Sequence, residues 1–107
     1  LKACDYCDDI FAETADVVLG DAWLEEYRED WRGTNVIVSR HPVIDELLDA
    51  VAASGQLVLE SIAADRAAAS QGGNVRHRRV GLSVRLTDDR AQGRVTPRKR
   101  VEPGQFS

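Results

Sequence analysis

The chain has 107 residues, of which 43% are hydrophobic and 30% charged. A chain of this length forms one domain with a modest core, and its composition excludes the disordered and fibrous classes. No apolar run approaches the roughly 18 residues of a membrane-spanning helix, and no signal peptide is visible. The only two cysteines have C-x-x-C spacing, which is no disulfide framework, so a reducing, cytoplasmic location is expected.

The net charge of −4 is divided unevenly along the chain. Residues 1–69 carry 5 Lys and Arg against 15 Asp and Glu, whereas residues 70–107 carry 9 against 3. A basic segment can contact nucleic acid, an acidic surface or an anionic cofactor. Nucleic-acid binders interleave stacking aromatics with such charges, and Phe106 is the only aromatic near the basic clusters. We therefore expect the basic segment to pack on the acidic part of the chain or on missing parts of the protein.

The first part of the chain predicts two strands with a helix between them. Residues 15–21 (ADVVLGD) are typical of a short buried strand that ends at a Gly-Asp turn, and residues 35–39 (NVIVS) contain three β-branched residues in succession. Residues 22–32 (AWLEEYREDWR) place aromatic side chains at i, i+4 and i+8, near one face of a helix. We expect this face to lie in the core or an interface; stacking on a flavin-like ring is the alternative. The three aromatic residues are Trp23, Tyr27 and Trp31.

The clearest helix is predicted over residues 42–54. Pro42 suits its first turn and Gly55 its C-terminal cap. Residues 56–60 (QLVLE) then predict a third strand, and a strand–helix–strand unit over 35–60 favours some parallel pairing. The expected fold is α/β or α+β, with a small mixed sheet of about three strands and packing helices.

The last third of the chain gives weaker signals. Residues 62–69 are Ala-rich and helical in propensity. Residues 75–86 fit both strand alternation and helical spacing, and we favour a helix. From Gly93 onward, Pro and Gly with few apolar residues suggest an extended or frayed tail. We therefore expect a folded domain over residues 1–92 and an extended basic tail over 93–107.

Cys4 and Cys7 are the strongest candidates for chemistry. Two intervening residues let a loop direct both sulfurs at one metal ion or iron–sulfur cluster, whereas a redox pair needs a lowered thiol pKa. The neighbouring Asp5, Asp8 and Asp9 would raise that pKa. A metal or cluster half-site is therefore favoured over incidental thiols and over a redox disulfide. Since such sites need four ligands, and since the first residue is not Met, we expect this chain to be a piece of a larger protein.

Two glycine-containing turns are weaker candidates for binding a cofactor. Gly20-Asp21 ends a predicted strand, where backbone can approach a ligand closely and a carboxylate can meet a hydroxyl or cation. Gly33-Thr34 could contact a phosphate. Neither turn matches a phosphate-binding fingerprint. A plain turn explains Gly20-Asp21 equally well, and it explains Gly33-Thr34 better than a phosphate contact does. No Ser/His/Asp set or carboxylate dyad can be assembled from the sequence.

The order of these features resembles a known family. Cys4-Asp5-Tyr6-Cys7, then ADVVLGDAW over residues 15–23, then GTNVIV over 33–38 and a Leu-rich helix, are similar to the C-terminal domain of the coenzyme F420 hydrogenase/dehydrogenase beta-subunit family. The resemblance covers residues 2–60 well and reaches residues 70–71 more loosely. The basic tail is not diagnostic.

This resemblance implies a fragment of an iron–sulfur flavoprotein oxidoreductase. Members pass electrons between a redox partner and coenzyme F420, a deazaflavin substrate, or a similar carrier, through a 4Fe–4S cluster and FAD. Cys4 and Cys7 match two of the family's cluster cysteines, so the chain would supply half of that site. The other half would lie in the N-terminal part of the same protein, and other redox subunits are the implied partners. The fragment alone is expected to be inactive.

The resemblance places the two turns in the flavin region by motif position alone, with Gly20, Asp21, Gly33 and Thr34 as the candidate residues. An alternative from a different class stays open beside it. The chain could be a non-catalytic zinc-binding or assembly module, in which the two cysteines share the ion with ligands from another chain or segment and the aromatic face docks a partner.

Overall fold

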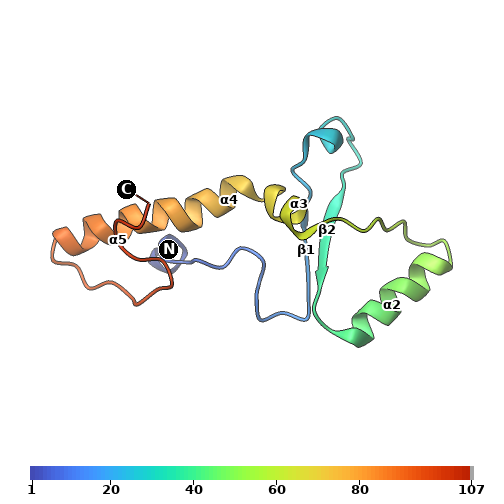
Figure 1. The fold of residues 1–107 in the computed structure, drawn as a ribbon, viewed down its shortest axis with the longest axis horizontal. Coiled ribbons are helices and arrows are strands. Elements are labelled where there is room, and N and C mark those ends of the chain that lie inside the picture. The colour runs from blue at the N-terminus through green and yellow to red at the C-terminus, as the bar shows by residue number, and fades with distance from the viewer. Residues whose placement is uncertain (107) are drawn as a thin grey trace. The chain divides into compact units, whose positions relative to one another are not determined.

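The computed structural model describes residues 1–106 and divides into two compact units (Figure 1). The helical unit contains residues 1–10 and the chain from residue 72 onward, and the hairpin unit contains residues 11–71. Over the described residues, no helix has both the length and the apolar character needed to cross a membrane. The family-like motifs of the sequence are thus split between the units, with the cysteine pair in one and both glycine-containing turns in the other.

The hairpin unit is built on two antiparallel strands, β1 (Val17–Asp21) and β2 (Asn35–Ser39), which confirm the two predicted strands. The prediction of about three strands with parallel pairing is wrong, since the described sheet has two strands and residues 56–60 form none. A strand needs a partner edge and an apolar layer, and Val58 is 88% exposed. The mixture of helices with an antiparallel hairpin is of the α+β class.

The helix predicted over residues 22–32 is also absent. The connection between the strands contains only one 3₁₀ turn, η1 (Glu25–Tyr27). The backbone N–H of Ala22 donates to the carbonyl of Thr34 at 2.9 Å, which continues the strand ladder past Asp21 into the segment that was expected to be helical. Its aromatic side chains therefore form no buried helical face, and Trp23 and Trp31 are 73% and 92% exposed.

The helix predicted over residues 42–54 is confirmed as α2 (Pro42–Ala53). His41 caps its start, because its Nδ1 accepts a hydrogen bond from the backbone N–H of Val43 at 3.2 Å. Gly55 adopts a φ of +76°, the left-handed conformation that ends many helices. No residue of α2 is buried in this unit, so its apolar stripe is largely exposed, and Leu47 is 61% exposed.

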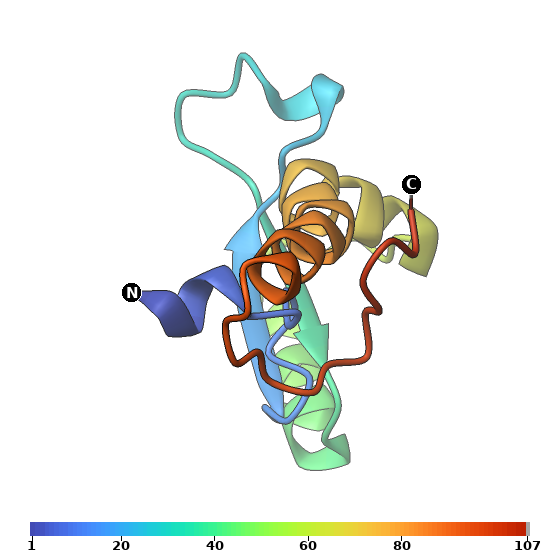
Figure 2. The same ribbon diagram turned by 90° about the vertical axis from the view of Figure 1, so that its left-hand side faces the viewer.

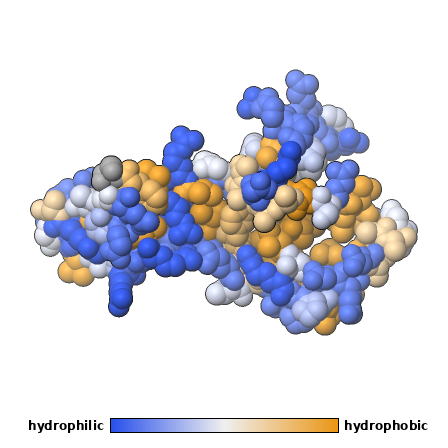
Figure 3. Space-filling model, viewed as in Figure 1, coloured by the Kyte–Doolittle hydropathy of each residue, from blue (hydrophilic) through white to orange (hydrophobic). Residues whose placement is uncertain are grey.

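A second helix of the hairpin unit, α3 (Ala64–Ala69), confirms the Ala-rich segment as helical. It is fastened to the strand connection by an ion pair between Arg66 and Glu26. Directly after α3, Gln71 Nε2 donates to the carbonyl of Asp21 at 2.7 Å. Apolar side chains gather over the strands in the space-filling view (Figure 3).

The helical unit contains the short helix α1 (Lys2–Asp5) and a continuous helical run made of α4 (Gly72–Arg76), the π-helical turn η2 (His77–Gly81) and α5 (Leu82–Ala91). The helix favoured for residues 75–86 is therefore confirmed. One face of α5 is buried, and the core of the unit consists of a small apolar cluster with Tyr6 packed against it. The clustered residues are Leu82, Leu86 and Val101.

The C-terminal segment packs on α5. Among residues 94–106 there is no helix or strand, but Val101 is only 3% exposed. Ser83 Oγ donates to the carbonyl of Glu102 at 2.8 Å and accepts from the backbone N–H of Gln105 at 3.0 Å. Figure 2 shows this segment curving around α5. The tail is therefore extended but not frayed, because α5 would otherwise leave two leucines without a cover.

Candidate metal centre

Both cysteines lie at the start of the helical unit and are free thiols. Cys4 is part of α1 and is exposed, whereas Cys7 follows the end of that helix and is half-buried. The backbone N–H of Cys7 donates to the carbonyl of Cys4 at 3.3 Å, which closes a turn over the two intervening residues. The turn places both side chains in one short segment that can present two sulfurs together.

A guanidinium group forms a hydrogen bond to the sulfur of Cys7. Arg78 Nη1 lies 2.8 Å from Cys7 Sγ and 2.6 Å from the carbonyl oxygen of Asp9. Arg78 comes from the π-helical turn, 71 residues further along the chain. A hydrogen bond from a cationic donor is stronger than a neutral one and favours negative charge on its acceptor. Cys7 Sγ also lies 3.5 Å from the carbonyl oxygen of Asp9, so one guanidinium and one carbonyl oxygen surround this sulfur.

Asp8, beside the cysteine, is neutralised by the basic C-terminal segment. Lys99 Nζ lies 3.1 Å from Asp8 Oδ1, and Arg100 Nε lies 3.1 Å from Asp8 Oδ2. Burial by itself would raise the pKa of this carboxyl, but the hydrogen bonds from Arg100 and Lys99 outweigh it and lower the pKa from 3.8 to about 2. One of the three acids that the sequence places around the cysteine pair is therefore balanced by cations in the folded unit.

The residues between the cysteines are held by α5. Arg85 Nε donates to the carbonyl of Asp5 at 2.8 Å, and the hydroxyl of Tyr6 donates to the carboxylate of Asp89. Neither contact is predictable from local sequence, because 80 or more residues separate the partners. The one signal that could have found them is the positive balance of residues 70–107 beside an acidic N-terminal segment.

The donor set fits half of a metal or cluster site. Cubane clusters and structural zinc need four ligands, and thiolates are preferred for both. Cys4 and Cys7 provide two thiols, but within residues 1–106 no group of three or more His, Cys, Asp or Glu side chains is placed to hold an ion. The chemistry of the pair and the guanidinium beside Cys7 fit half of such a site.

The weaker candidates meet at one end of the hairpin. Asp21 pairs with Asn35 in the strand register, which brings the Gly20-Asp21 turn beside Gly33-Thr34. A Cβ added to Gly20 would meet only Gln71 Nε2, at 3.8 Å, which is an ordinary contact. Gly33 has a φ of +80°, which its turn alone explains. Flavin contact at this end stays a prediction.

Comparison with known proteins gives one match. A family model that describes the C terminus of the beta subunit of coenzyme F420 hydrogenase/dehydrogenase matches residues 1–65. No curated protein and no solved structure matches the chain. The matched range contains the cysteine pair, both strands and α2, whereas the helical run from residue 72 and the basic C-terminal segment lie outside it.

Proposed function

The chain belongs to the family of C-terminal domains of coenzyme F420 hydrogenase/dehydrogenase beta subunits, and from this premise we propose that it serves an iron–sulfur flavoprotein oxidoreductase. In this proposal, Cys4 and Cys7 bind one side of a 4Fe–4S cluster, and the rest of the beta subunit provides the other ligands. FAD and coenzyme F420 or a similar carrier complete the path, and other redox subunits are the partners.

The observation that carries the proposal is the environment of the cysteine pair. Two free thiols lie in one turn, and a guanidinium contacts the sulfur of Cys7. A cluster, when bound, supplies one-electron transfer, because such chemistry belongs to the cofactor. The residues of this chain bind it, orient its ligands and surround it with positive charge. The hairpin end with Gly20-Asp21 and Gly33-Thr34 is the proposed flavin contact, from motif position alone.

The test uses the intact beta subunit, purified without oxygen. We expect iron, labile sulfide and flavin in the wild type, and less iron and sulfide in Cys4→Ser and Cys7→Ser. Ala3→Ser is the matched control, since it adds the same hydroxyl to exposed α1 without removing a thiol. A wild-type protein with neither iron nor flavin would overturn the proposal.

The 107-residue chain alone provides a second check. We expect it to form no complete cluster and to reduce no deazaflavin, because it offers only two thiolates. Robust reduction of the deazaflavin by this chain alone would contradict the half-site.

A second candidate function is an assembly module that shares a zinc ion with another segment. It is favoured by the exposure of Trp23 and Trp31, large aromatic side chains that are common at protein interfaces. Stoichiometric zinc without visible absorbance in the intact beta subunit would support this function over the cluster.

A further inference from the structure

We propose that Arg78 is a positioning residue whose hydrogen bond to Cys7 Sγ sets the electronic properties of whatever metal the cysteine pair binds. That the bound group is an iron–sulfur cluster rests on the proposed function. The contact between Arg78 and Cys7 does not depend on it. Arg78 lies outside the residues that the family model matches. The family assignment therefore says nothing about it.

The contact is directed at the sulfur. Arg78 is half-buried, and its Nη1 bridges Cys7 Sγ at 2.8 Å and the carbonyl of Asp9 at 2.6 Å. The carbonyl fixes the guanidinium, and the guanidinium in turn fixes the side chain of the cysteine. Outer partners that orient a ligand in this way tune a metal site, and their loss typically costs about 10–100-fold in metal affinity or activity.

A second arginine also forms a hydrogen bond to the segment that contains Cys7. Arg85 follows Arg78 by seven residues in the same helical run and donates to the carbonyls of Asp5 at 2.8 Å and His77 at 3.1 Å. The two guanidiniums therefore hold both ends of the segment from Asp5 to Asp9. Gly81 leaves room for this arrangement, because an added Cβ would lie 2.9 Å from Arg85 Nη1.

The local helix geometry supports a functional role for Arg78. It lies in the π-helical turn η2, between α4 and α5. Such turns are rare and are frequently found at functional sites. Here the turn carries the one arginine that contacts a cysteine sulfur among the described residues.

The physical consequence has a definite sign. An N–H donor and a positive charge at a ligand sulfur stabilise electron density on it and raise the reduction potential of a bound cluster. The same contact lowers the energy of the sulfur lone pairs. Its loss moves a sulfur-to-metal charge-transfer band to longer wavelength. If Arg78 only stabilised the loop through its hydrogen bond to Asp9, its replacement would change stability. It would change neither the reduction potential nor the wavelength of the charge-transfer band.

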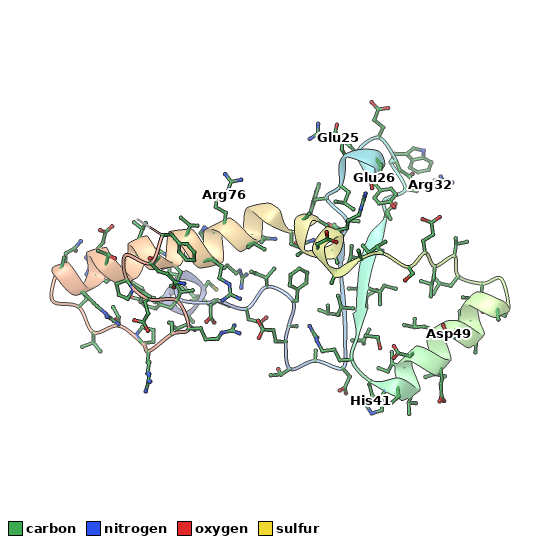
Figure 4. All side chains as sticks on the ribbon, viewed as in Figure 1. Glu25, Glu26, Arg32, His41, Asp49 and Arg76 are labelled. Carbon is green, nitrogen blue, oxygen red and sulfur yellow. The ribbon has the colours of Figure 1, made fainter. Side chains whose placement is uncertain are left out.

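The first experiment uses the 107-residue chain with Co²⁺ alone, without oxygen. We expect a thiolate-to-cobalt band in the wild type, a shift to longer wavelength in Arg78→Met, which has no donor, and partial recovery in Arg78→Lys. Arg76→Met is the matched control. Arg76 is exposed and projects outward from α4, and its side chain makes no hydrogen bond or ion pair with other described residues (Figure 4).

The second experiment measures the midpoint potential of the cluster in the intact beta subunit, where Arg78→Met should give a lower value and Arg76→Met an unchanged one. Circular dichroism checks that each variant is folded. A wild-type chain without a thiolate band, an Arg78→Met band at the wild-type position, or an equal shift in Arg76→Met would overturn the inference. Absence of iron from the intact wild-type protein would instead overturn the proposed function, since the cobalt measurement decides the role of Arg78 independently.

Discussion

The hydroxyl of Tyr6, between the two cysteines, donates a hydrogen bond to the carboxylate of Asp89, 83 residues further along the chain. Arg94 Nη1 donates to the same carboxylate at 2.6 Å. The hydrogen bonds from Tyr6 and Arg94 lower the pKa of Asp89, and the hydrogen bond to Asp89 raises the pKa of Tyr6 above 10.0. A buried charge on α5 therefore anchors the cysteine segment.

Replacing Tyr6 with Phe should remove this anchor and lower the melting temperature of the helical unit. A group whose pKa is raised by folding stabilises the fold below its unfolded value and loses that contribution as the pH rises through the folded one. The phenolate absorbance of the wild type minus that of Tyr6→Phe should therefore titrate with a midpoint above 10.0. A Tyr27→Phe control should keep that step, and a midpoint at or below 10.0 would contradict the contact.

The Asp8 pairs predict a loss of stability in acid. Because folding lowers the pKa of Asp8 from 3.8 to about 2, its contribution is complete above pH 3.8 and disappears as the pH falls toward 2. The shift corresponds to about 2 kcal/mol at most, and the exposure of Arg100 reduces this to about 1 kcal/mol. Asp8→Asn should therefore lower the free energy of unfolding of the helical unit at pH 6 by about 1 kcal/mol.

Urea unfolding followed by circular dichroism at pH 6 and at pH 2 measures this difference. Asp49→Asn is the matched control, because Asp49 is exposed on α2 and has no ion pair with other described residues (Figure 4). An Asp8→Asn effect that is equal at both pH values would show that the ion pairs are not its cause.

The sequence predicts the elements whose signals are local, and it misses those that depend on a distant partner. Pro42 and Gly55 delimit α2 by their own backbone preferences, and the β-branched run of residues 35–39 identifies β2. Residues 56–60 have the local pattern of a strand, but they pair with no other strand in the described part of the chain. A pattern alone therefore does not report whether a partner exists.

The candidate site shows the same limit. The spacing of Cys4 and Cys7 identifies the pair, but the acids adjacent in sequence do not reveal which cations lie beside it. Asp8 is paired with Lys99 and Arg100, which lie more than 90 residues away and approach only after folding. The helix predicted from the aromatic repeat at residues 23, 27 and 31 is wrong for a related reason. These residues connect β1 to β2, and the pairing of the two strands determines the conformation of the connection.

Arg40 should stabilise the turn that precedes β1. Its Nη1 donates to the carbonyls of Ala12 at 3.0 Å and Ala15 at 2.9 Å, and its Nη2 donates to that of Phe11 at 2.9 Å. Ala12 has a φ of +45°, which is strained for a residue with a Cβ. Arg40→Ala should therefore lower the free energy of local opening at residues 11–16 by about 1 kcal/mol.

Hydrogen exchange of these amides measures that change. Arg40→Lys should recover only part of it, because one ammonium group cannot span three carbonyls. Arg32→Ala is the control, since Arg32 pairs only with nearby Asp30 among the described residues (Figure 4). Unchanged exchange in Arg40→Ala would show that the turn is held by its own backbone.

The apolar cluster of the helical unit should be its most sensitive point. Leu86 is 0% exposed, and with Leu82 and Val101 it forms the whole described core cluster of that unit. Leu86→Ala should cost about 2–5 kcal/mol, whereas Leu47→Ala on the exposed face of α2 should change stability by less than about 0.5 kcal/mol. Because Val101 packs on Leu86, the larger loss should also release the C-terminal segment and expose Cys7 to alkylating reagents. If Cys7 in Leu86→Ala reacted with the alkylating reagent as slowly as in the wild type, the position of the cysteine segment would not depend on this core.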